Sequence, residues 1–236
     1  MPVLLTPSRV IPVTSLTVPL PIDTLFDPAR PLEIEIGCGK GRFLSARAAQ
    51  HPETQYLGIE RMLSRVAKLD KKAGRLKLDN LRVLRLEAFY TFYYLLPAHR
   101  VRTVYVFFPD PWPKRHHHNR RLFSPLFLDA LWARLVIGGT VQVATDHLDY
   151  FAEIRTRLAA DPRFREIPAM VRAPHEQTEF EHIFRGQGLP IGQCGFQSLP
   201  APERPLPPLT ITPDMEPRGE RASDSCPDQE TRQEND

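Results

Sequence analysis

The residues with the clearest chemical potential lie between Phe107 and Arg121, where the chain reads Phe-Phe-Pro-Asp-Pro-Trp-Pro-Lys and then Arg-His-His-His-Asn-Arg-Arg. Proline fixes its own φ angle and restricts the residue before it, so Asp110 between two prolines is held stiffly. Trp112 offers an apolar plane, and the basic run that follows can neutralise phosphates. Trp112 can pack against a nucleic-acid base or form the wall of a pocket beside the Asp110 carboxylate. The basic run alone is more typical of a solvated loop than of a phosphate-binding one.

A glycine-rich turn supplies a second candidate, Glu35-Ile36-Gly37-Cys38-Gly39-Lys40-Gly41. Glycines where a strand passes into a helix permit a tight bend and a close approach of the backbone to a ligand. The dinucleotide fingerprint requires a glycine at position 42, where this chain has Arg42. The acid before the turn and the G-x-G-x-G spacing resemble the cofactor loop of S-adenosylmethionine-dependent methyltransferases; a bare glycine turn is the alternative.

Glu60 follows Gly41 by nineteen residues, at the end of the apolar stretch Gln55–Glu60. A carboxylate at the end of the second strand of such a unit can accept hydrogen bonds from both hydroxyls of a ribose. Alone, Glu60 is equally typical of a solvated surface acid. Together with the glycine turn it predicts the ribose clamp of a nucleoside cofactor.

These residues require a scaffold that gathers strand ends. Short apolar runs alternate with helical patterns, which predicts parallel strands joined by crossover helices and hence an α/β, Rossmann-like fold with a mostly parallel central sheet and helices on both faces. Strands are expected at 32–36, 55–60, 82–87, 101–108, 140–145, 164–169 and 191–199. Helices are expected at about 43–49, 62–76, 88–96, 124–136 and 147–160, with Ser124 as the cap of the fourth and Gly138-Gly139 as its stop.

In sheets of this kind the ligand lies beyond the C-terminal ends of the strands. Each of the five principal strand ends carries an acid: Glu35 before the glycine turn, Glu60, Glu87, Asp110 and Asp146. The fold prediction therefore places the chemically interesting residues together.

Composition divides the chain into three parts. Prolines concentrate in 1–31, which holds seven of the 25, and in 200–236, which holds eight. The last segment carries four Arg and nine Asp or Glu, a net charge of −5. Because the whole chain has a net charge of +3, residues 1–199 have a net charge of +8. We expect a proline-rich N-terminal arm (1–31), one domain (32–199) and a disordered acidic tail (200–236), and a basic domain is compatible with a polyanionic partner.

Other classes of protein find little support. Cys38, Cys194 and Cys226 show no metal-type or disulfide-type spacing, and the three adjacent histidines lack a partner acid at ligand spacing, so no metal is expected. No secretory signal or apolar run of membrane-spanning length is apparent, which predicts a cytoplasmic protein without membrane contact.

The combined motifs resemble the bacterial tRNA (guanine-N7-)-methyltransferases. The resemblance spans about 35–181 and includes Gly-Ile-Glu at 58–60, Ala-Thr-Asp at 144–146 and Thr-Glu-Phe-Glu at 178–181 beside the two motifs above. It implies an S-adenosylmethionine-dependent enzyme that acts on tRNA as a monomer or homodimer, with guanine 46 of the variable loop as target. It implies cofactor contacts at Glu35, Gly37, Gly39, Gly41, Glu60, Glu87 and Asp110, with Asp110 also catalytic. It implies substrate or tRNA contacts at Lys114, Arg115, His117, Arg120, Arg121, Asp146, Thr178, Phe180 and Glu181.

Three positions depart from the family pattern. Glu87 stands where Asp or Asn is usual, Asn119 where Lys is usual, and Glu179 where Lys is usual. The first lengthens a cofactor-binding arm. The other two remove or reverse a positive charge near the expected RNA face.

The implied reaction needs little acid–base chemistry, because guanine N7 carries a free lone pair at neutral pH. The enzyme must align N7 with the methyl carbon and the sulfur, and it must stabilise a guanine that becomes cationic. Asp110-Pro111-Trp112 nearly matches the Asp/Asn-Pro-Pro-aromatic loop of adenine-N6 methyltransferases, so an enzyme of that type is the alternative. A tRNA-binding protein that kept the fold without activity is the alternative outside enzymes.

Overall fold

The structure is a computed structural model that describes residues 8–203 and 205–207. The chain divides into a compact unit of residues 1–204 and a second unit of residues 205–236, of which only 205–207 are described. Cys226 and nearly all of the expected acidic tail therefore lie outside the described residues. All elements below belong to the first unit.

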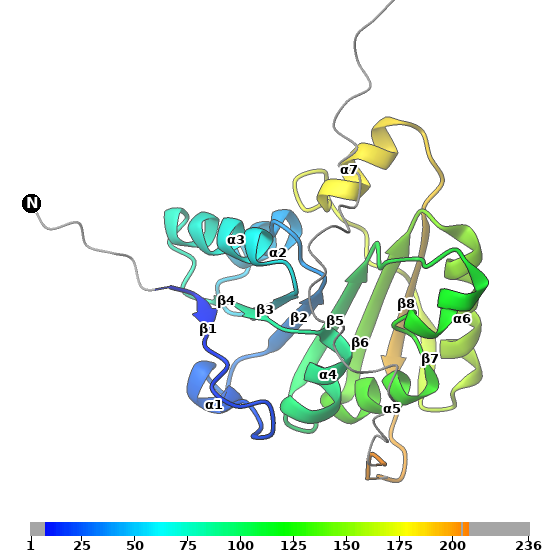
Figure 1. Cartoon of the computed structure of the whole chain (residues 1–236), viewed down its shortest axis with the longest axis horizontal. Coiled ribbons are helices and arrows are strands. Elements are labelled where there is room, and N and C mark those ends of the chain that lie inside the picture. The colour runs from blue at the N-terminus through cyan, green and yellow to red at the C-terminus, as the bar shows by residue number, and fades with distance from the viewer. Residues whose placement is uncertain (1–7, 204, 208–236) are drawn as a thin grey trace, which may run out of the picture. The chain divides into compact units, whose positions relative to one another are not determined.

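An eight-stranded sheet forms the centre of this unit, in the order β1-β4-β3-β2-β5-β6-β8-β7 (Figure 1). The strands β1 to β6 run parallel, while β8 is antiparallel to both β6 and β7. Their bounds are Val10–Ile11, Leu32–Ile36, Gln55–Glu60, Leu81–Arg85, Val101–Phe107, Leu135–Thr145, Phe164–Ile167 and Gly192–Ser198 for β1 to β8.

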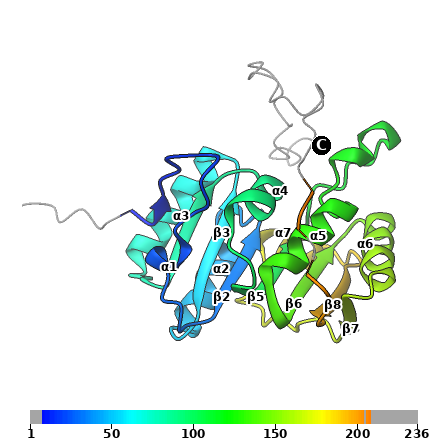
Figure 2. The same ribbon diagram turned by 90° about the horizontal axis from the view of Figure 1, so that it is seen from below.

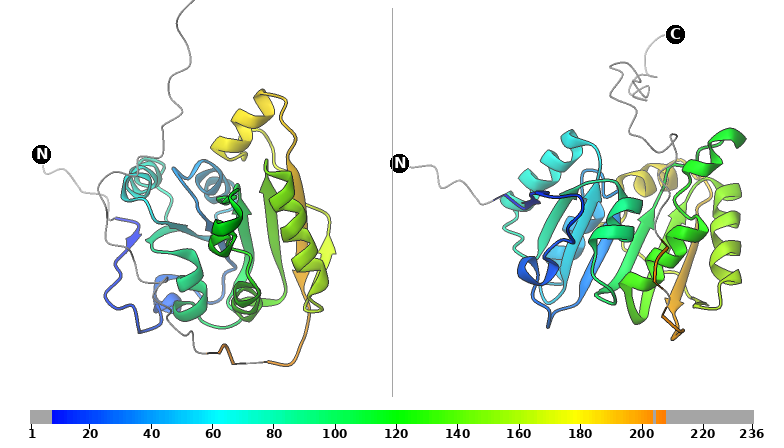
Figure 3. Two further views of the ribbon diagram at one scale, coloured as in Figure 1. Left: turned by 45° about the vertical axis from the view of Figure 1, so that its right-hand side comes forward. Right: turned by 60° about the horizontal axis from the view of Figure 1, so that its bottom comes forward.

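Helices lie on both faces of the sheet, as the views from below and from two oblique directions show (Figures 2 and 3). The α-helices α1 to α7 span Ile22–Leu25, Arg42–Gln50, Leu63–Arg75, Ala88–Tyr90, Pro125–Arg134, Leu148–Ala160 and Glu179–Gly186. A π-helical turn, Thr91–Leu95, continues α4, and a 3₁₀ segment, Arg115–Arg120, follows β5. No helix in the described part of the chain has the length and apolar character needed to cross a membrane.

The predicted strands 32–36 and 55–60 coincide with β2 and β3 at both ends. Every residue of these two strands is buried, as expected for central parallel strands covered on both faces. Ser124 caps α5 as predicted, because its hydroxyl accepts a hydrogen bond of 3.2 Å from the amide of Phe127, and Pro125 occupies the first helical position.

Gly138 and Gly139 do not stop a helix, so that prediction was wrong. The helix α5 already ends at Arg134, and β6 begins at Leu135 and runs through both glycines. Gly138 adopts a φ of 80°, and the pairing of β6 with β5 shifts register at this end of β5. A Cβ on Gly139 would lie 2.9 Å from the carbonyl oxygen of Arg102. The glycines therefore form an irregularity inside a strand that starts five residues before the predicted start at 140.

The N-terminal segment contributes to the sheet. Val10 and Ile11 pair in parallel with Val83 and Leu84 of β4 and cover that strand's outer edge. Further along, Leu20, Ile22 and Phe26 are buried in the core. These short elements, like α7 and the 3₁₀ segment, were not predicted from the sequence.

Candidate active site and nucleic-acid interface

The turn between β2 and α2 has the geometry of a ligand cradle. Gly37, Gly39 and Gly41 adopt φ angles of 70°, 54° and 69°, a region that side chains with a Cβ rarely occupy. A Cβ on Gly37 or Gly39 would meet no atom within 4 Å, so the turn faces open space there. A Cβ on Gly41 would instead lie 2.2 Å from Leu69 Cδ1 of α3. Two of the three glycines thus leave room for a ligand, and the third allows α3 to pack closely.

Glu60 lies at the end of β3 and points back to this turn. Its Oε2 accepts a hydrogen bond of 3.1 Å from the amide of Gly39, and its Oε1 accepts one of 2.9 Å from the amide of Met62. The guanidinium of Arg65 lies 3.8 Å from Oε2. The carboxylate is thereby oriented beside the cradle, where the sequence placed it.

Glu35, the penultimate residue of β2, is buried, and its Oε2 has no hydrogen-bond partner in the described structure. Burial and the neighbouring charge of Glu60 raise the pKa of Glu35 well above 4.5, and the positive charge of Arg172 opposes this rise. A buried oxygen without a partner is unfavourable unless a donor is supplied. It therefore fits the ammonium or hydroxyl donors of a bound S-adenosylmethionine.

Glu87 lies close after the end of β4 and caps α4. Its two carboxylate oxygens accept hydrogen bonds from the amides of Phe89 (3.0 Å) and Tyr90 (2.7 Å). The side chain is exposed, and carboxylate oxygens can each accept a second bond. The carboxylate of Glu87 is therefore engaged at the helix terminus.

Asp110 lies on a strained loop after β5. Phe108 and Trp112, on either side of it, adopt left-handed φ angles of 54° and 43°, which are costly for such bulky residues. Asp110 itself is exposed and forms no hydrogen bond or ion pair with any described residue. Strain on both sides of an unpartnered carboxylate is typical of a functional loop.

Arg120 and Arg121 have different surroundings. Arg120 is exposed, and its guanidinium lies over the ring of Trp112 at 4.9 Å. Arg121 is buried; it donates a hydrogen bond of 2.8 Å to the carbonyl oxygen of Pro111 and forms an ion pair with Glu153. The expected phosphate contact from Arg121 is not supported by this placement, because the side chain is committed to bracing the loop.

The rest of the basic run is exposed or half-buried. Lys114 and Arg115 extend into solvent, and His117 packs edge-on against Trp112 with ring centroids 5.7 Å apart. Partial burial and the positive charges of His116, Arg120 and Lys114 lower the pKa of His117, which favours its neutral form. Asn119, the departure from Lys, is exposed among these residues.

The segment 178–181 forms the start of α7. Thr178 caps the helix by accepting a hydrogen bond of 3.0 Å from the amide of Glu181. Glu181 is fully buried and is bound by Arg172 (2.6 Å) and Arg185 (2.9 Å). The expected substrate contact from Glu181 is therefore not supported, because both oxygens already hold arginines. The Thr-x-x-Glu spacing matches a capping-box signature, a signal for this helix start that was missed.

Phe180 is the member of this segment that faces outward. Its ring is about half exposed, stacks on Phe184 one helical turn later with centroids 6.0 Å apart, and lies 6.2 Å from Phe108 beside Asp110. The structure thus brings Phe180 next to the Asp110 loop, although 70 residues separate them (180 − 110). Phe184 was missed, and its spacing of four residues from Phe180 was the available signal.

Asp146, directly after β6, is exposed and has no hydrogen bond to the described residues. The adjacent strands β5 and β6 run parallel, so Asp146 and Asp110 follow strand ends at the same edge of the sheet. This edge therefore carries two unpartnered carboxylates.

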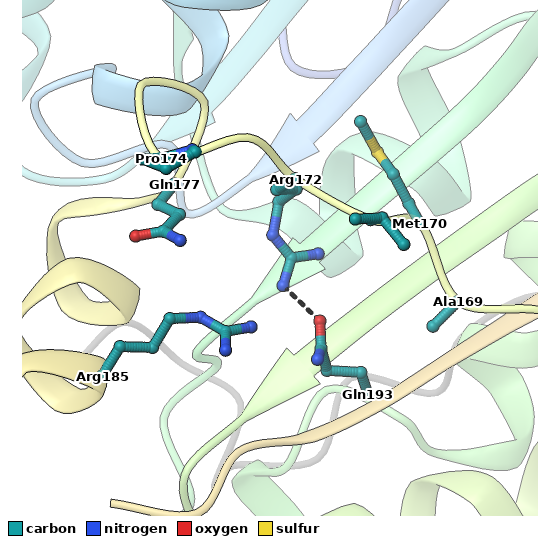
Figure 4. A pocket seen from close by; sticks show the side chains of 8 residues that line it. Ala169, Met170, Arg172, Pro174, Gln177, Arg185 and Gln193 are labelled. Carbon is teal, nitrogen blue, oxygen red and sulfur yellow. Dashed lines mark hydrogen bonds between the residues drawn. The ribbon is translucent and has the colours of Figure 1, made fainter. Parts of the chain in front are cut away.

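A cavity of about 410 Å³ adjoins the site beneath the segment 169–177 (Figure 4). Arg172 points across it and donates a hydrogen bond of 2.7 Å to Gln193 of β8, and Arg185 of α7 extends into it from the other side. Arg172 also lies over the ring of Phe107 at 4.3 Å. The sequence offered no signal for Arg172, because only the fold shows that it joins β5, α7 and β8. Among the described residues no cluster of His, Cys, Asp or Glu could hold a metal ion.

Comparisons with known proteins agree with this geometry. Residues 29–193 match a family described as "Putative methyltransferase". The chain is 43% identical over 166 residues to the tRNA (guanine-N(7)-)-methyltransferase of Halorhodospira halophila. The aligned region covers 68% of this chain and 71% of that protein. The chain is 36% identical over 173 residues to the enzyme of the same name from Nitrosospira multiformis, which covers 73% of this chain and 75% of the relative.

Solved structures confirm the fold prediction. The 16S rRNA methyltransferase KamB superposes with a TM-score of 0.54 at 19% identity, covering 77% of this chain and 93% of that one. TrmN from Thermus thermophilus superposes with a TM-score of 0.53 at 18% identity, covering 75% of this chain and 47% of the other. The fold is the Rossmann-like class I methyltransferase fold, for which S-adenosylmethionine is the methyl donor. The acidic strand ends and the glycine cradle agree with these relatives, and the resemblance is confirmed. The chain belongs to the family of bacterial tRNA (guanine-N7-)-methyltransferases.

Proposed function

We propose that this chain transfers a methyl group from S-adenosylmethionine to N7 of a guanine in tRNA, with guanine 46 of the variable loop as the target. The observation that carries the proposal is the unpartnered carboxylate of Asp110, held between two strained residues at the sheet edge that also carries the cradle. The activity named for its relatives supports the choice of reaction.

The residues around the cradle fit the cofactor. Gly37 and Gly39 leave space for it, Glu60 beside the cradle would accept hydrogen bonds from its ribose hydroxyls, and the unpartnered oxygen of Glu35 would accept one from a cationic or hydroxyl group. Glu87 completes the proposed set from the next strand end. When bound there, S-adenosylmethionine supplies an electrophilic methyl group on a positively charged sulfur.

Asp110 has the main role in the proposed reaction. Guanine N7 attacks through its own lone pair, so the protein needs no general base, and the leaving sulfur carries away its bonding electron pair. The carboxylate of Asp110 accepts hydrogen bonds from guanine N1–H and N2–H and stabilises the positive charge that the ring acquires. Asp146 is placed to assist from the neighbouring strand end. The base has to leave its stack to reach these groups.

The RNA surface is proposed to include Lys114, Arg115, His117 and Arg120 on one side and Phe180 on the other. Phe180 and Phe184 present stacked rings that a nucleotide base can pack on. Thr178, Glu181 and Arg121 act as positioning residues, since they cap α7, anchor it and brace the Asp110 loop.

The organisation of the chain is part of the proposal. Residues 32–199 form the catalytic domain, 1–31 an arm and 200–236 an acidic tail that does not contribute to the reaction. One chain supplies every proposed site residue, which is compatible with either a monomer or a homodimer. A tRNA substrate supports a cytoplasmic location.

Mass spectrometry of tRNA nucleosides after incubation with isotopically labelled S-adenosylmethionine tests the function. Labelled 7-methylguanosine is expected, and sequencing around the modified nucleotide should locate it at position 46. Labelled N6-methyladenosine would instead establish the alternative enzyme. Binding of S-adenosylmethionine without any labelled nucleoside would indicate a protein that kept the fold and lost the activity.

A further inference from the structure

The helix α3 carries a strongly basic surface that none of the motifs above includes. Lys68, Lys71, Lys72 and Arg75, which we call the α3 basic face, follow an i, i+3, i+4, i+7 spacing and so share one side of the helix. The opposite side is buried through Val66, Leu69 and Ala73, which pack on the sheet and the cradle. The basic side chains therefore point away from the core.

No anion in the described structure neutralises this face. The side chains of Lys68, Lys71, Lys72 and Arg75 form no ion pair or hydrogen bond with any described residue. The single acid of the helix, Asp70, is engaged elsewhere, because it accepts hydrogen bonds from the hydroxyl of Ser8 and the amide of Arg9. The face is thus a patch of one sign rather than a mixed, self-compensating surface.

The positive charges are also crowded. Lys72 is half-buried, and burial together with the charges of Arg42 and Arg75 lowers its pKa, with Glu179 as the only opposing influence. Glu179, the departure from the family's usual Lys, is itself paired with Lys40 at 3.2 Å. Cations held this close to one another repel, and a bound polyanion would relieve the repulsion.

The location of α3 connects this face to the proposed reaction centre. Leu69 packs against Gly41 of the cradle, and Arg65, on the preceding turn, lies near Glu60. The helix lies beside β3 and β4 on one side of β2, whereas the basic run Arg115–Arg120 follows β5 on the other side (Figure 1). Two basic surfaces therefore flank the carboxylate-lined edge at which guanine would react.

We propose that the α3 basic face binds the phosphate backbone of tRNA, as a second surface across the cradle from the basic loop. The proposal rests on the proposed function for the identity of its partner. Contact with two separated stretches of backbone would fix the orientation of the RNA relative to Asp110, which phosphate contacts do in other complexes. It also explains how the chain tolerates Asn119 and Glu179, since the charge missing at those positions is supplied by α3.

A pair of charge-matched double variants of the full chain tests this. Lys68→Gln/Lys72→Gln removes two charges from the face, and Arg155→Gln/Arg165→Gln removes two exposed charges at α6 and β7, at the far end of the sheet. Affinity for tRNA is measured by filter binding from about 50 to 200 mM salt. The α3 variant is expected to bind at least about tenfold more weakly and to show a salt slope reduced by roughly one to two. In methylation assays the α3 variant is expected to show a higher KM for tRNA rather than a lower kcat.

The salt slope of the control variant should differ from that of the unaltered protein by much less than one. Lys68→Arg/Lys72→Arg, which keeps both charges, should bind tRNA as the unaltered protein does. Equal affinities and slopes for the α3 variant and the control would overturn the proposal and make the face a solvated one. Melting temperatures and S-adenosylmethionine affinities of all variants identify any misfolding. If the unaltered protein binds tRNA through α3 but forms no 7-methylguanosine, the proposed function alone is refuted. If the unaltered protein does not bind tRNA, both proposals are refuted.

Discussion

The guanidinium of Arg121 donates a hydrogen bond to the carbonyl oxygen of Pro111, one residue after Asp110, while its other end pairs with Glu153 of α6 and lies over the ring of Tyr150. The loop that carries the carboxylate is thereby attached to a helix packed on the sheet. The exposed neighbour Arg120 has no such attachment, so two adjacent arginines have separate tasks.

Replacing these arginines singly should separate the tasks. Arg121→Ala removes the bond to the Pro111 carbonyl and one of the two arginines that pair with Glu153, the other being Arg157. The expected loss of unfolding free energy is about 1.5–3 kcal/mol, with a lower kcat. Arg120→Ala should leave the melting temperature unchanged and weaken tRNA binding, with a salt slope smaller by about one. Thermal unfolding and filter binding measure both. A reversed pattern would show that Arg121 contacts the RNA and Arg120 supports the loop.

Asp110→Ala should abolish the electrostatic assistance to the cationic guanine. We expect turnover at saturating tRNA to fall at least about a hundredfold, about 2.7 kcal/mol in the activation free energy. Binding of tRNA should hardly change, because Asp110 touches no phosphate in this scheme. Single-turnover methylation with a parallel binding curve is the measurement, and a variant that lost tRNA affinity but kept its rate would contradict the role.

Two glycine substitutions should act by different routes. Gly41→Ala places a methyl group 2.2 Å from Leu69 at a left-handed φ, and its melting temperature should drop in line with a loss of about 2–4 kcal/mol. Gly39→Ala meets open space, so it bears the backbone strain alone, about 1–2 kcal/mol. The added methyl group of Gly39→Ala enters the cradle, however, and should weaken binding of S-adenosylmethionine. Calorimetry of both variants distinguishes these effects, and equal cofactor affinities would contradict the cradle.

Glu35→Gln should stabilise the protein without cofactor and weaken cofactor binding. Burial raises the pKa of Glu35 in the folded chain, so below about pH 4.5 the carboxyl is protonated in both states. Above that pH the unfolded state ionises first, and the unfolding free energy falls as the pH rises toward the folded pKa. The variant lacks this penalty, so its gain in melting temperature should grow with pH.

Affinity of the Glu35→Gln protein for S-adenosylmethionine should fall about tenfold or more, since a charge-assisted hydrogen bond is lost. Calorimetry and thermal unfolding at several pH values measure the two effects. A Gln variant that binds the cofactor as tightly as the unaltered chain would remove Glu35 from the cofactor site.

A chain that ends at Pro200 should keep its melting temperature and turnover. The last strand, β8, ends at Ser198, and the carbonyl of Leu199 accepts a hydrogen bond of 2.9 Å from the indole of Trp132. Beyond it, Glu203 forms an ion pair with His99 but is largely exposed, and such pairs contribute little. Loss of turnover in the shortened chain would place residues after 200 in the active site.

The sequence sufficed for elements whose residues are uniform in character. The strands β2 and β3 are apolar runs between turn residues, so their ends could be read directly. The start of β6 was missed because Gly138-Gly139 resembles a helix stop, and only pairing with β5 shows that the strand continues through it. Local patterns do not reveal such pairing.

The same limit applies to the site. The glycines and acids at strand ends were correctly predicted to lie at one edge of the sheet, because the ends of parallel strands meet there. Whether a charged side chain faces solvent or the interior depends on packing from distant segments. Arg121 and Glu181 were therefore expected to bind substrate, whereas Glu153 and Arg172, from other parts of the chain, hold them inside.

The position of β8 between β6 and β7 sets the order in which the enzyme can be assembled during synthesis. In the described sheet β7 pairs with β8 alone, and β8 is the last strand to leave the ribosome. The parallel half, with the cofactor cradle, can form while the C-terminal third is still being made. The insertion of β8 adds a further link to α7, because Arg172 binds both Glu181 of that helix and Gln193 of β8. We therefore expect a nascent chain to form the cofactor cradle before the sheet edge at β8 and β7 is complete.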